Sequence, residues 1–182
     1  MSGNITHDGT MTKHTFTGSS ATKIDDKGRF VLPQQMRYGL VENGRLEFTL
    51  GLGLGGCLAI YRQSDIAQIV DMFKGKQHVV KYQKFFTLFF STLHHTTCDK
   101  LGRVLVPQIL KKARRLEGEI VVAGVMNKIE VWQKSKYDAD LLSFLEGDGE
   151  DLQKLTEEAF SLMDEKPVEK PAEEELNEIF SN

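Results

Sequence analysis

Two short segments of this chain, residues 25–29 and 99–103, share the pattern Asp-x-x-Gly-Arg and bring together residue types that can bind an anion. Aspartate and glycine are typical of tight turns, because the Asp side chain bonds the backbone two residues on and Gly supplies a positive φ. An arginine directly after such a turn projects a planar fork of donors, which fits guanine O6 and N7 or a phosphate. The pattern therefore predicts a nucleic-acid contact at each arginine. The alternative is an Asp–Arg ion pair that only holds the turn closed.

Charge is divided unevenly along the 182 residues, whose net charge is −3. Residues 136–182 carry 15 Asp and Glu against 4 Lys and Arg, a net charge of −11, whereas residues 1–135 carry 11 against 19, a net charge of +8. A basic body is a candidate polyanion surface, since each phosphate contact releases condensed counterions. The alternative is a charged surface that only keeps the protein solvated. The repetition of the turn within a basic body favours a DNA surface.

The eight residues of interest in the two turns divide into two roles. The residues predicted to contact DNA are Lys27, Arg29, Lys100 and Arg103, and the residues predicted to orient the loops are Asp25, Gly28, Asp99 and Gly102.

A glycine-rich stretch matches a dinucleotide fingerprint formally, as Gly51-x-Gly53-x-x-Gly56 with Asp71 twenty residues past its first glycine. That fingerprint needs a helix after the glycines, so that the helix N-terminus faces the pyrophosphate. Here residues 57–61 read Cys-Leu-Ala-Ile-Tyr and predict a strand. We therefore interpret the glycines as a hairpin connection and reject the fingerprint, which leaves a nucleotide-dependent enzyme as the weakest alternative.

His94, His95 and Cys98 have a spacing that can hold a metal, but no fourth ligand lies near them in the sequence. A histidine pair on the surface of a strand is the preferred interpretation. No Ser-His-Asp order or nucleophile elbow is visible. We therefore predict that the protein is not an enzyme and that it has no metal, no cofactor and no small-molecule substrate.

An internal repeat surrounds the two turns. Shifting the chain by 74 residues aligns 16–37 with 90–111, and seven of these 22 pairs are identical. The identical pairs are Phe16/Phe90, Thr22/Thr96, Asp25/Asp99, Gly28/Gly102, Arg29/Arg103, Pro33/Pro107 and Gln34/Gln108. Conservative pairs follow, Arg37/Lys111 among them. The body is therefore predicted to be two copies of one unit, 16–75 and 90–145.

Each copy is predicted to run strand, turn, strand, helix, strand, strand, helix. In the first copy these elements are expected at 22–24, 25–29, 30–32, 34–40, 46–50 and 57–61, with a final helix capped by Ser64. A unit of this size is small for independent stability, so two copies are expected to interlock into one barrel. Five phenylalanines and a tyrosine between residues 73 and 90 are interpreted as core or subunit interface.

The residues of the turns also carry a family resemblance. Residues 25–33 (Asp-Asp-Lys-Gly-Arg-Phe-Val-Leu-Pro) with Arg37, residues 99–107 (Asp-Lys-Leu-Gly-Arg-Val-Leu-Val-Pro) and residues 124–132 (Gly-x-x-Asn-Lys-Ile-Glu-x-Trp) resemble the bacterial MraZ proteins. The resemblance implies a β-rich, mixed α+β fold: the AbrB-like (SpoVT-AbrB, MazE-like) swapped-hairpin or double-split β-barrel, with short helices and a pseudo-twofold axis between two tandem repeats. It also implies a ring-shaped homo-oligomer.

MraZ proteins regulate transcription of the operon for division and cell-wall synthesis and bind short G-rich tandem repeats upstream of it. In the family the Asp-x-x-x-Arg loops bind DNA, a role that maps onto Asp25 with Arg29 and onto Asp99 with Arg103. The resemblance covers about residues 14–141 and says nothing of the acidic stretch beyond it. The expected organisation is an N-terminal extension (1–15), repeat 1 (16–75), a connecting helical segment (76–89), repeat 2 (90–145) and an acidic, partly disordered tail (146–182).

Composition restricts the remaining possibilities. No apolar run approaches the ~20 residues that span a bilayer, and the first residues lack the apolar core of a secretion signal. Two cysteines without a Cys-x-x-Cys motif do not make a disulfide framework. We expect a cytoplasmic, nucleoid-associated protein whose partners are double-stranded DNA and copies of itself, with no membrane contact. The alternative is a scaffold ring that recruits a protein partner through its acidic tail.

Overall fold

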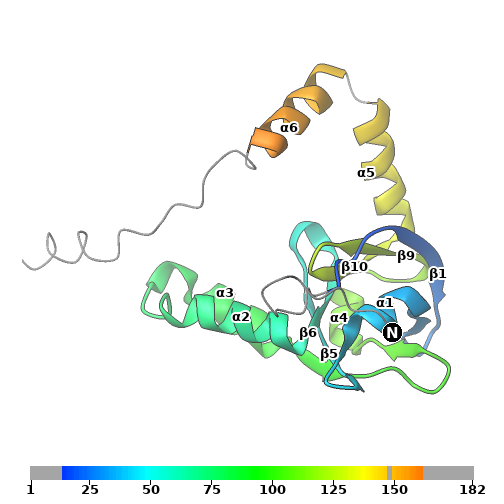
Figure 1. Ribbon diagram of the computed structural model, residues 1–182, viewed down its shortest axis with the longest axis vertical. Coiled ribbons are helices and arrows are strands. Elements are labelled where there is room, and N and C mark those ends of the chain that lie inside the picture. The colour runs from blue at the N-terminus through cyan, green and yellow to red at the C-terminus, as the bar shows by residue number, and fades with distance from the viewer. Residues whose placement is uncertain (1–13, 147–148, 162–182) are drawn as a thin grey trace, which may run out of the picture. The chain divides into compact units, whose positions relative to one another are not determined.

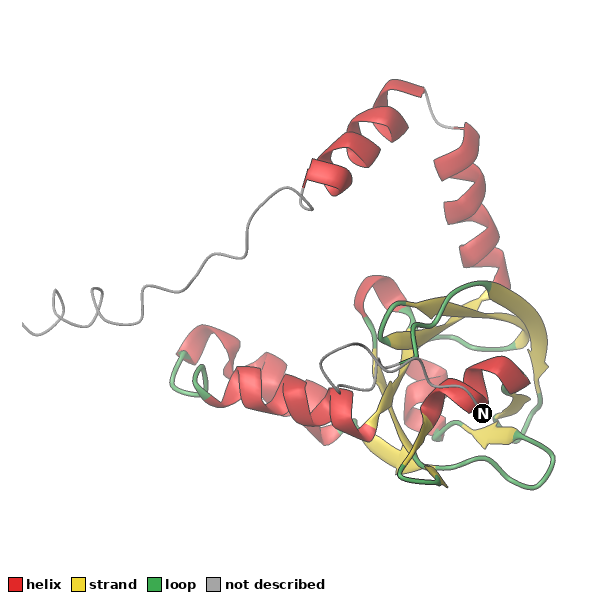
Figure 2. Cartoon of the chain, in the orientation of Figure 1, coloured by secondary structure: helices red, strands yellow, loops and turns green. Residues whose placement is uncertain are grey.

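The computed structural model describes residues 14–146 and 149–161 and divides the chain into two compact units, residues 1–138 and 139–182 (Figure 1). The first unit is mixed α/β, with antiparallel strands joined by short helices (Figure 2). This confirms the expected β-rich, mixed class. The repeat and domain boundaries stay predictions.

The elements follow one another closely along the chain. In order they are β1 (Ser19–Ile24), β2 (Arg29–Val31), α1 (Gln34–Leu40), β3 (Val41–Glu42), β4 (Arg45–Leu46), β5 (Phe48–Leu52), the 3-10 turn η1 (Leu54–Gly56), β6 (Leu58–Arg62), α2 (Gln63–Lys74), the 3-10 turn η2 (Val80–Tyr82), α3 (Gln83–Ser91), β7 (His94–Thr96), β8 (Arg103–Leu105), α4 (Gln108–Ala113), β9 (Gly118–Val125), β10 (Lys128–Gln133), α5 (Lys134–Glu146) and α6 (Gly149–Ser161). Helix α6 lies within the acidic stretch.

Six strands form one antiparallel sheet in the order β1-β9-β10-β6-β5-β7. At one edge β1 pairs with β9, so that Ser19 lies opposite Ala123. At the other edge β7 pairs with β5, so that Thr96 lies opposite Phe48. The strand order is symmetric between the two halves of the body. It is the same from either edge once β1 is exchanged with β7, β5 with β9 and β6 with β10. Each edge strand therefore pairs with a strand from the other half of the body.

Strands β2 and β8 form a separate two-stranded ribbon that continues directly from the two turns. Phe30 lies opposite Val104, and both side chains are buried, whereas their neighbours Val31 and Leu105 are exposed. This alternation is the period of two expected of a strand with one face on the core.

One hydrophobic core joins the ribbon, the short helices and the sheet. Its fully buried members include Phe30 and Val104 of the ribbon, Leu40 of α1, Leu110 of α4, and the sheet residues Phe48, Leu50, Leu58, Ile60, Ile120, Val122, Ile129 and Val131. The strand after each turn is thus fixed on the same core as the strands of the large sheet.

The start of α2 differs from the expectation that Ser64 caps it. The N-cap is Arg62, the helix begins at Gln63, and Ser64 lies within the first turn. The backbone N–H of Ser64 donates to Glu42 Oε2 at 3.1 Å, and its hydroxyl donates to the other carboxylate oxygen. A carboxylate from β3 therefore takes the place of a side-chain cap, since it satisfies an unpaired N–H and lies near the positive end of the helix dipole.

A buried ion pair holds α2 to α1 and to the start of the described chain. Arg62 and Asp65 are 2% and 3% exposed, and Arg62 Nη1 lies 3.0 Å from Asp65 Oδ2. Arg62 Nε donates to the Gly39 carbonyl at 2.7 Å, Nη2 donates to the His14 carbonyl, and the guanidinium lies 4.3 Å from the centre of the Phe16 ring. The buried cation thus has a polar partner at each of its three nitrogens.

The phenylalanine-rich segment is not part of the core, so the core interpretation is wrong. No residue of α3 is buried, and Figure 1 shows α2 and α3 extending together away from the strands. Only the first turns of α2 pack on the sheet, through Ile66 against Ala59 and Tyr61. The rest of α2 and α3 hold each other through Phe73, whose ring centre lies 5.3 Å from that of Phe86.

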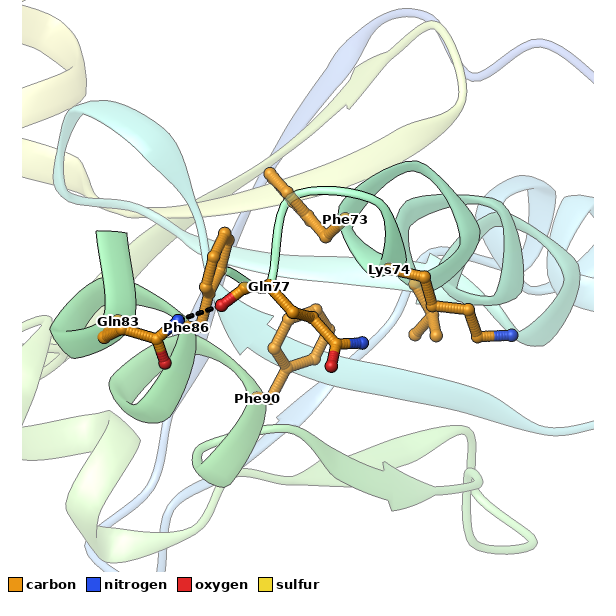
Figure 3. A pocket seen from close by; sticks show the side chains of 7 residues that line it. Phe73, Lys74, Gln77, Gln83, Phe86 and Phe90 are labelled. Carbon is orange, nitrogen blue, oxygen red and sulfur yellow. Dashed lines mark hydrogen bonds between the residues drawn. The ribbon is translucent and has the colours of Figure 1, made fainter. Parts of the chain in front are cut away.

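A groove of about 400 Å³ runs between these two helices (Figure 3). It is lined by Val70, Phe73, Lys74, Gln77, Gln83, Phe86 and Phe90. Large apolar side chains of η2 and α3 that do not line the groove are exposed, among them Val80 and Leu88. The subunit-interface interpretation of this segment stays a prediction.

The buried ion pair predicts a contrast between two aspartates of α2. Asp65→Ala should lower the free energy of unfolding by about 3–5 kcal/mol, because it leaves the Arg62 charge buried without its carboxylate. Asp71→Ala removes the exposed pair with Lys74, whose Nζ lies 2.7 Å from Asp71 Oδ1, and should cost less than about 1 kcal/mol. Urea unfolding of both variants at one protein concentration checks this, and equal losses would contradict it.

Candidate nucleic-acid interface

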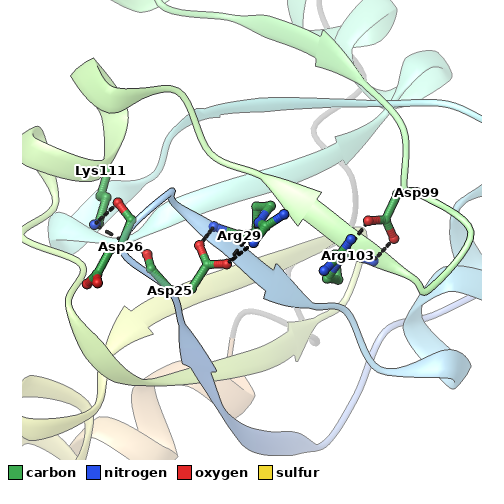
Figure 4. Close-up of polar contacts among 6 residues, drawn as sticks. All are labelled: Asp25, Asp26, Arg29, Asp99, Arg103 and Lys111. Carbon is green, nitrogen blue, oxygen red and sulfur yellow. Dashed lines mark hydrogen bonds and ion pairs between the residues drawn. The ribbon is translucent and has the colours of Figure 1, made fainter.

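The first turn is closed by its aspartate. Asp25 Oδ1 accepts the backbone N–H of Arg29 at 2.8 Å, and Oδ2 accepts Arg29 Nε at 2.8 Å and lies 2.7 Å from Nη2. The Gly28 N–H donates to the Asp25 carbonyl at 2.9 Å, and its φ of +83° is in the region that favours glycine. The carboxylate therefore fixes both the backbone of the turn and the orientation of the guanidinium (Figure 4).

The second turn is closed by its aspartate in a similar way. Asp99 Oδ1 accepts the backbone N–H groups of Leu101 and Arg103, each at 2.9 Å, and Oδ2 accepts Arg103 Nε at 2.6 Å. Gly102 has a φ of +75° and donates its N–H to the Asp99 carbonyl at 2.9 Å. Asp99 and Gly102 therefore make contacts in the second turn like those of Asp25 and Gly28 in the first.

The ribbon places the two turns at its opposite ends, with their arginines between them (Figure 4). The Gly28 carbonyl accepts the Val106 N–H at 2.8 Å, and the Gly102 carbonyl accepts the Leu32 N–H at 3.0 Å. Arg29 lies opposite Leu105, two residues from Arg103, so the two arginines are diagonal neighbours with α-carbons about 7–8 Å apart. Since Phe30 and Val104 point into the core, both arginines lie on the outer face of the ribbon.

Each guanidinium keeps its outer end open. Arg29 gives Nε and Nη2 to Asp25, and its Nη1 has no hydrogen-bond partner within 14–146 and 149–161. The arginine side chains are 33% and 34% exposed. The ion pair considered from sequence as an alternative is thus formed, and it occupies only one edge of each fork. The donors at the outer end are the ones that a bidentate contact with guanine or phosphate uses.

Two further cations lie against the turns, although neither was predicted from sequence to contact DNA. Lys111 of α4 is placed at the first turn, with Nζ 3.5 Å from the carbonyl oxygens of Asp25 and Asp26. Arg37 of α1 covers the second turn so closely that a Cβ on Gly102 would lie 2.6 Å from its Nη1. The alignment of Arg37 with Lys111 in the internal repeat was the sequence signal that could have identified both residues. Lys27 and Lys100, predicted to contact DNA, are exposed.

The other candidate residues lie apart from the turns. His94 and His95 are exposed on β7, as expected, and His95 Nδ1 lies 2.8 Å from Thr49 Oγ1. The glycine-rich stretch leads from β5 through η1 into β6, which confirms a strand after the glycines. Burial raises the pKa of both cysteine thiols to about 11.

The described part of the chain lacks both a metal-binding cluster and a membrane-spanning helix. It contains no group of three or more His, Cys, Asp or Glu arranged to hold a metal ion. None of the helices described in it is both long and apolar enough to cross a membrane.

Comparison with known proteins decides the family. The sequence model of a family described as "MraZ protein, putative antitoxin-like" matches residues 89–160, which include the second turn. A protein of Desulforamulus reducens named "Transcriptional regulator MraZ" is 33% identical over 124 residues, covering 68% of this chain and 84% of that protein. The chain belongs to the MraZ family. The resemblance noted from the two turns is therefore confirmed.

In this member of the MraZ family the turn geometry also fixes the ionisation of the two aspartates. The backbone N–H of Arg29 and then its side chain lower the pKa of Asp25 below its ordinary value of 3.8. The same two contacts from Arg103 lower the pKa of Asp99. Both carboxylates are therefore charged wherever an ordinary aspartate is, and they remain charged at lower pH.

These pKa shifts predict a stability difference with a defined sign. A carboxylate whose folded pKa lies below its unfolded value of 3.8 stabilises the fold above that pH and loses the effect as pH falls through the folded pKa. The Asp25→Asn/Asp99→Asn variant should therefore be less stable than the native protein at neutral pH, and the gap should narrow in acid.

Unfolding measured across pH checks this prediction. Asp26→Asn is the control, because no hydrogen bond to its carboxylate is present among the described residues, and it should follow the native curve. A gap that stays constant from neutral pH to acid would rule out the stabilising role of the two carboxylates.

Proposed function

We propose that this protein is a sequence-specific DNA-binding transcriptional regulator that contacts double-stranded DNA through its two arginine turns. The observation that carries the proposal is the placement of Arg29 and Arg103 on the outer face of one ribbon, each held at one edge by its aspartate and open at the other. Lys27 and Lys100 are exposed within the same turns and supply further positive charge. The name of the Desulforamulus relative, a transcriptional regulator, supports this function.

The proposed target is a set of short G-rich tandem repeats upstream of the operon for division and cell-wall synthesis. A bidentate arginine–guanine contact discriminates by only about 1–3 kcal/mol, so one turn reads a genome poorly. Two turns on one ribbon, repeated around a ring-like homo-oligomer, multiply that discrimination through effective concentration. A repeated protein surface therefore suits a repeated DNA sequence.

The proposed scaffold is the swapped-hairpin, double-split barrel built from copies 16–75 and 90–145. The pairings of β1 with β9, β7 with β5 and β2 with β8 support it, because each joins one copy to the other. In such a barrel the two turns are related by a pseudo-twofold axis, which accounts for their equal hydrogen bonding.

The DNA contact predicts a loss on removing either arginine. Arg29→Ala and Arg103→Ala should each weaken binding to the upstream DNA by about 1–3 kcal/mol relative to a scrambled duplex, because each removes one bidentate donor pair. Arg45→Ala, which removes an exposed arginine of β4, is the matched control and should leave this ratio unchanged. Binding titrations on both duplexes measure it, with circular dichroism to show intact folding. Native affinity in both turn variants would exclude the turns as the reading site.

The oligomer is proposed to bury the exposed apolar residues of α2 and α3 against a second copy. Sedimentation at micromolar concentration should show an assembly, and Leu88→Glu should shift it towards smaller species because it places a charge among the exposed apolar side chains of α3. Gln35→Glu puts the same charge on an exposed position of α1, outside α2 and α3, and is the control. A native protein that sediments as a monomer would contradict the ring.

A further inference from the structure

The two turns differ in the charge that accompanies them. Residues 100–116, from the second turn to just beyond α4, carry six Lys and Arg and no Asp or Glu. The aligned residues 26–42, from the first turn to the end of β3, carry three Lys and Arg and two acidic residues. At the end of α4 and just after it, Lys112, Arg114 and Arg115 stand in place of Tyr38, Leu40 and Val41.

The positive charge of α4 lies beside the first turn, although α4 follows the second turn in sequence. Lys111 Nζ lies 3.5 Å from the carbonyl oxygens of Asp25 and Asp26 (Figure 4). A Cβ on Gly28 would lie 3.8 Å from Lys111 Cδ and 3.8 Å from Gln108 Nε2. The side of α4 that carries Gln108 and Lys111 therefore faces the first turn.

Lys112 lies on the adjoining part of this helix surface. It is four residues after Gln108, and residues four apart are neighbours on a helix. Its side chain is exposed, and no hydrogen bond or ion pair of its ammonium is found within 14–146 and 149–161. Lys111, in contrast, already points its ammonium at the backbone of the turn. The first turn thus has one lysine that braces it and one that faces solvent beside it.

The second turn is arranged differently. Arg37 fills the space over Gly102, and its Nε is buried without a hydrogen-bond partner in the described part of the chain. The position that corresponds to Lys112 is Tyr38, which is 75% exposed and has a phenol in place of an ammonium group. The second turn therefore has a brace but no solvent-facing cation at this place.

We propose that Lys112 binds a DNA backbone phosphate beside the first turn, with Lys111 as the residue that positions this turn, and that the second turn has no equivalent phosphate contact. The inference rests on the proposed function and deepens it, because it makes the two turns unequal readers of DNA. A lysine ammonium is a compact charge suited to phosphate, and such a contact carries no sequence information. Each phosphate neutralised contributes about −0.9 to the slope of log affinity against log salt concentration.

The experiment compares equivalent positions of the two halves. Lys112→Gln should reduce the salt slope by about one for each first turn on the DNA, equally on the upstream duplex and on a duplex of unrelated sequence. Tyr38→Gln should leave the slope unchanged. Tyr38→Lys should increase it by about one per second turn, since it gives that turn the missing cation. Thermal unfolding of each variant checks that the fold is intact.

Each outcome bears on a separate claim. A native salt slope in Lys112→Gln, in a protein that binds DNA and loses specificity on Arg29→Ala, overturns this inference and leaves the proposed function standing. The inference is also overturned if Lys112→Gln changes the ratio of the affinity for the upstream duplex to the affinity for the unrelated duplex. A phosphate contact carries no sequence information, so its loss should weaken both affinities equally. Absence of DNA binding by the native protein overturns the proposed function and this inference together.

Discussion

The arginine surface depends on the pairing of β2 with β8. Each strand has only three residues, and within the described chain they form a sheet of two with no other strand. A strand of that length is not stable by itself, so each turn needs the other. The register also sets which side chains face outward: a slip of one residue would turn Phe30 out and Arg29 in. The core beneath Phe30 and Val104 prevents that slip and so fixes the spacing of the two guanidinium groups.

The turns could be predicted from sequence because their interactions are local. Asp25 and Arg29 are four residues apart, and the aspartate, the glycine and the arginine specify the loop without help from distant segments. The prediction that Ser64 caps α2 was wrong for the opposite reason, because it depends on a distant residue. Glu42, from β3, accepts the backbone N–H at the start of α2. The contacts of Arg62 with the His14 and Gly39 carbonyls likewise could not be predicted from local patterns, because these residues are far from Arg62 in the sequence.

The phenylalanines of α3 show a second limit of sequence reasoning. Apolar composition indicates that a surface tends to be buried, but it does not say whether the covering atoms belong to the same chain. Here the core is already filled by the strands, the ribbon and the short helices, and α3 contributes nothing to it. Repetition in sequence has a similar limit: Arg37 and Lys111 align with each other, yet each lies against the turn of the opposite half.

The exchange of edge strands has a consequence for synthesis on the ribosome. Ser19 of β1 pairs with Ala123 of β9, so about 100 residues must be translated between one partner and the other. At a translation rate of roughly 5–20 residues per second, β1 stays without its partner strand for on the order of 5–20 s. The first arginine turn also lacks its partner during most of this time, because Arg29 pairs with Leu105. The nascent first half therefore emerges with unpaired strand edges, and the six-stranded sheet is completed only when β10, the last of its strands along the chain, has left the exit tunnel.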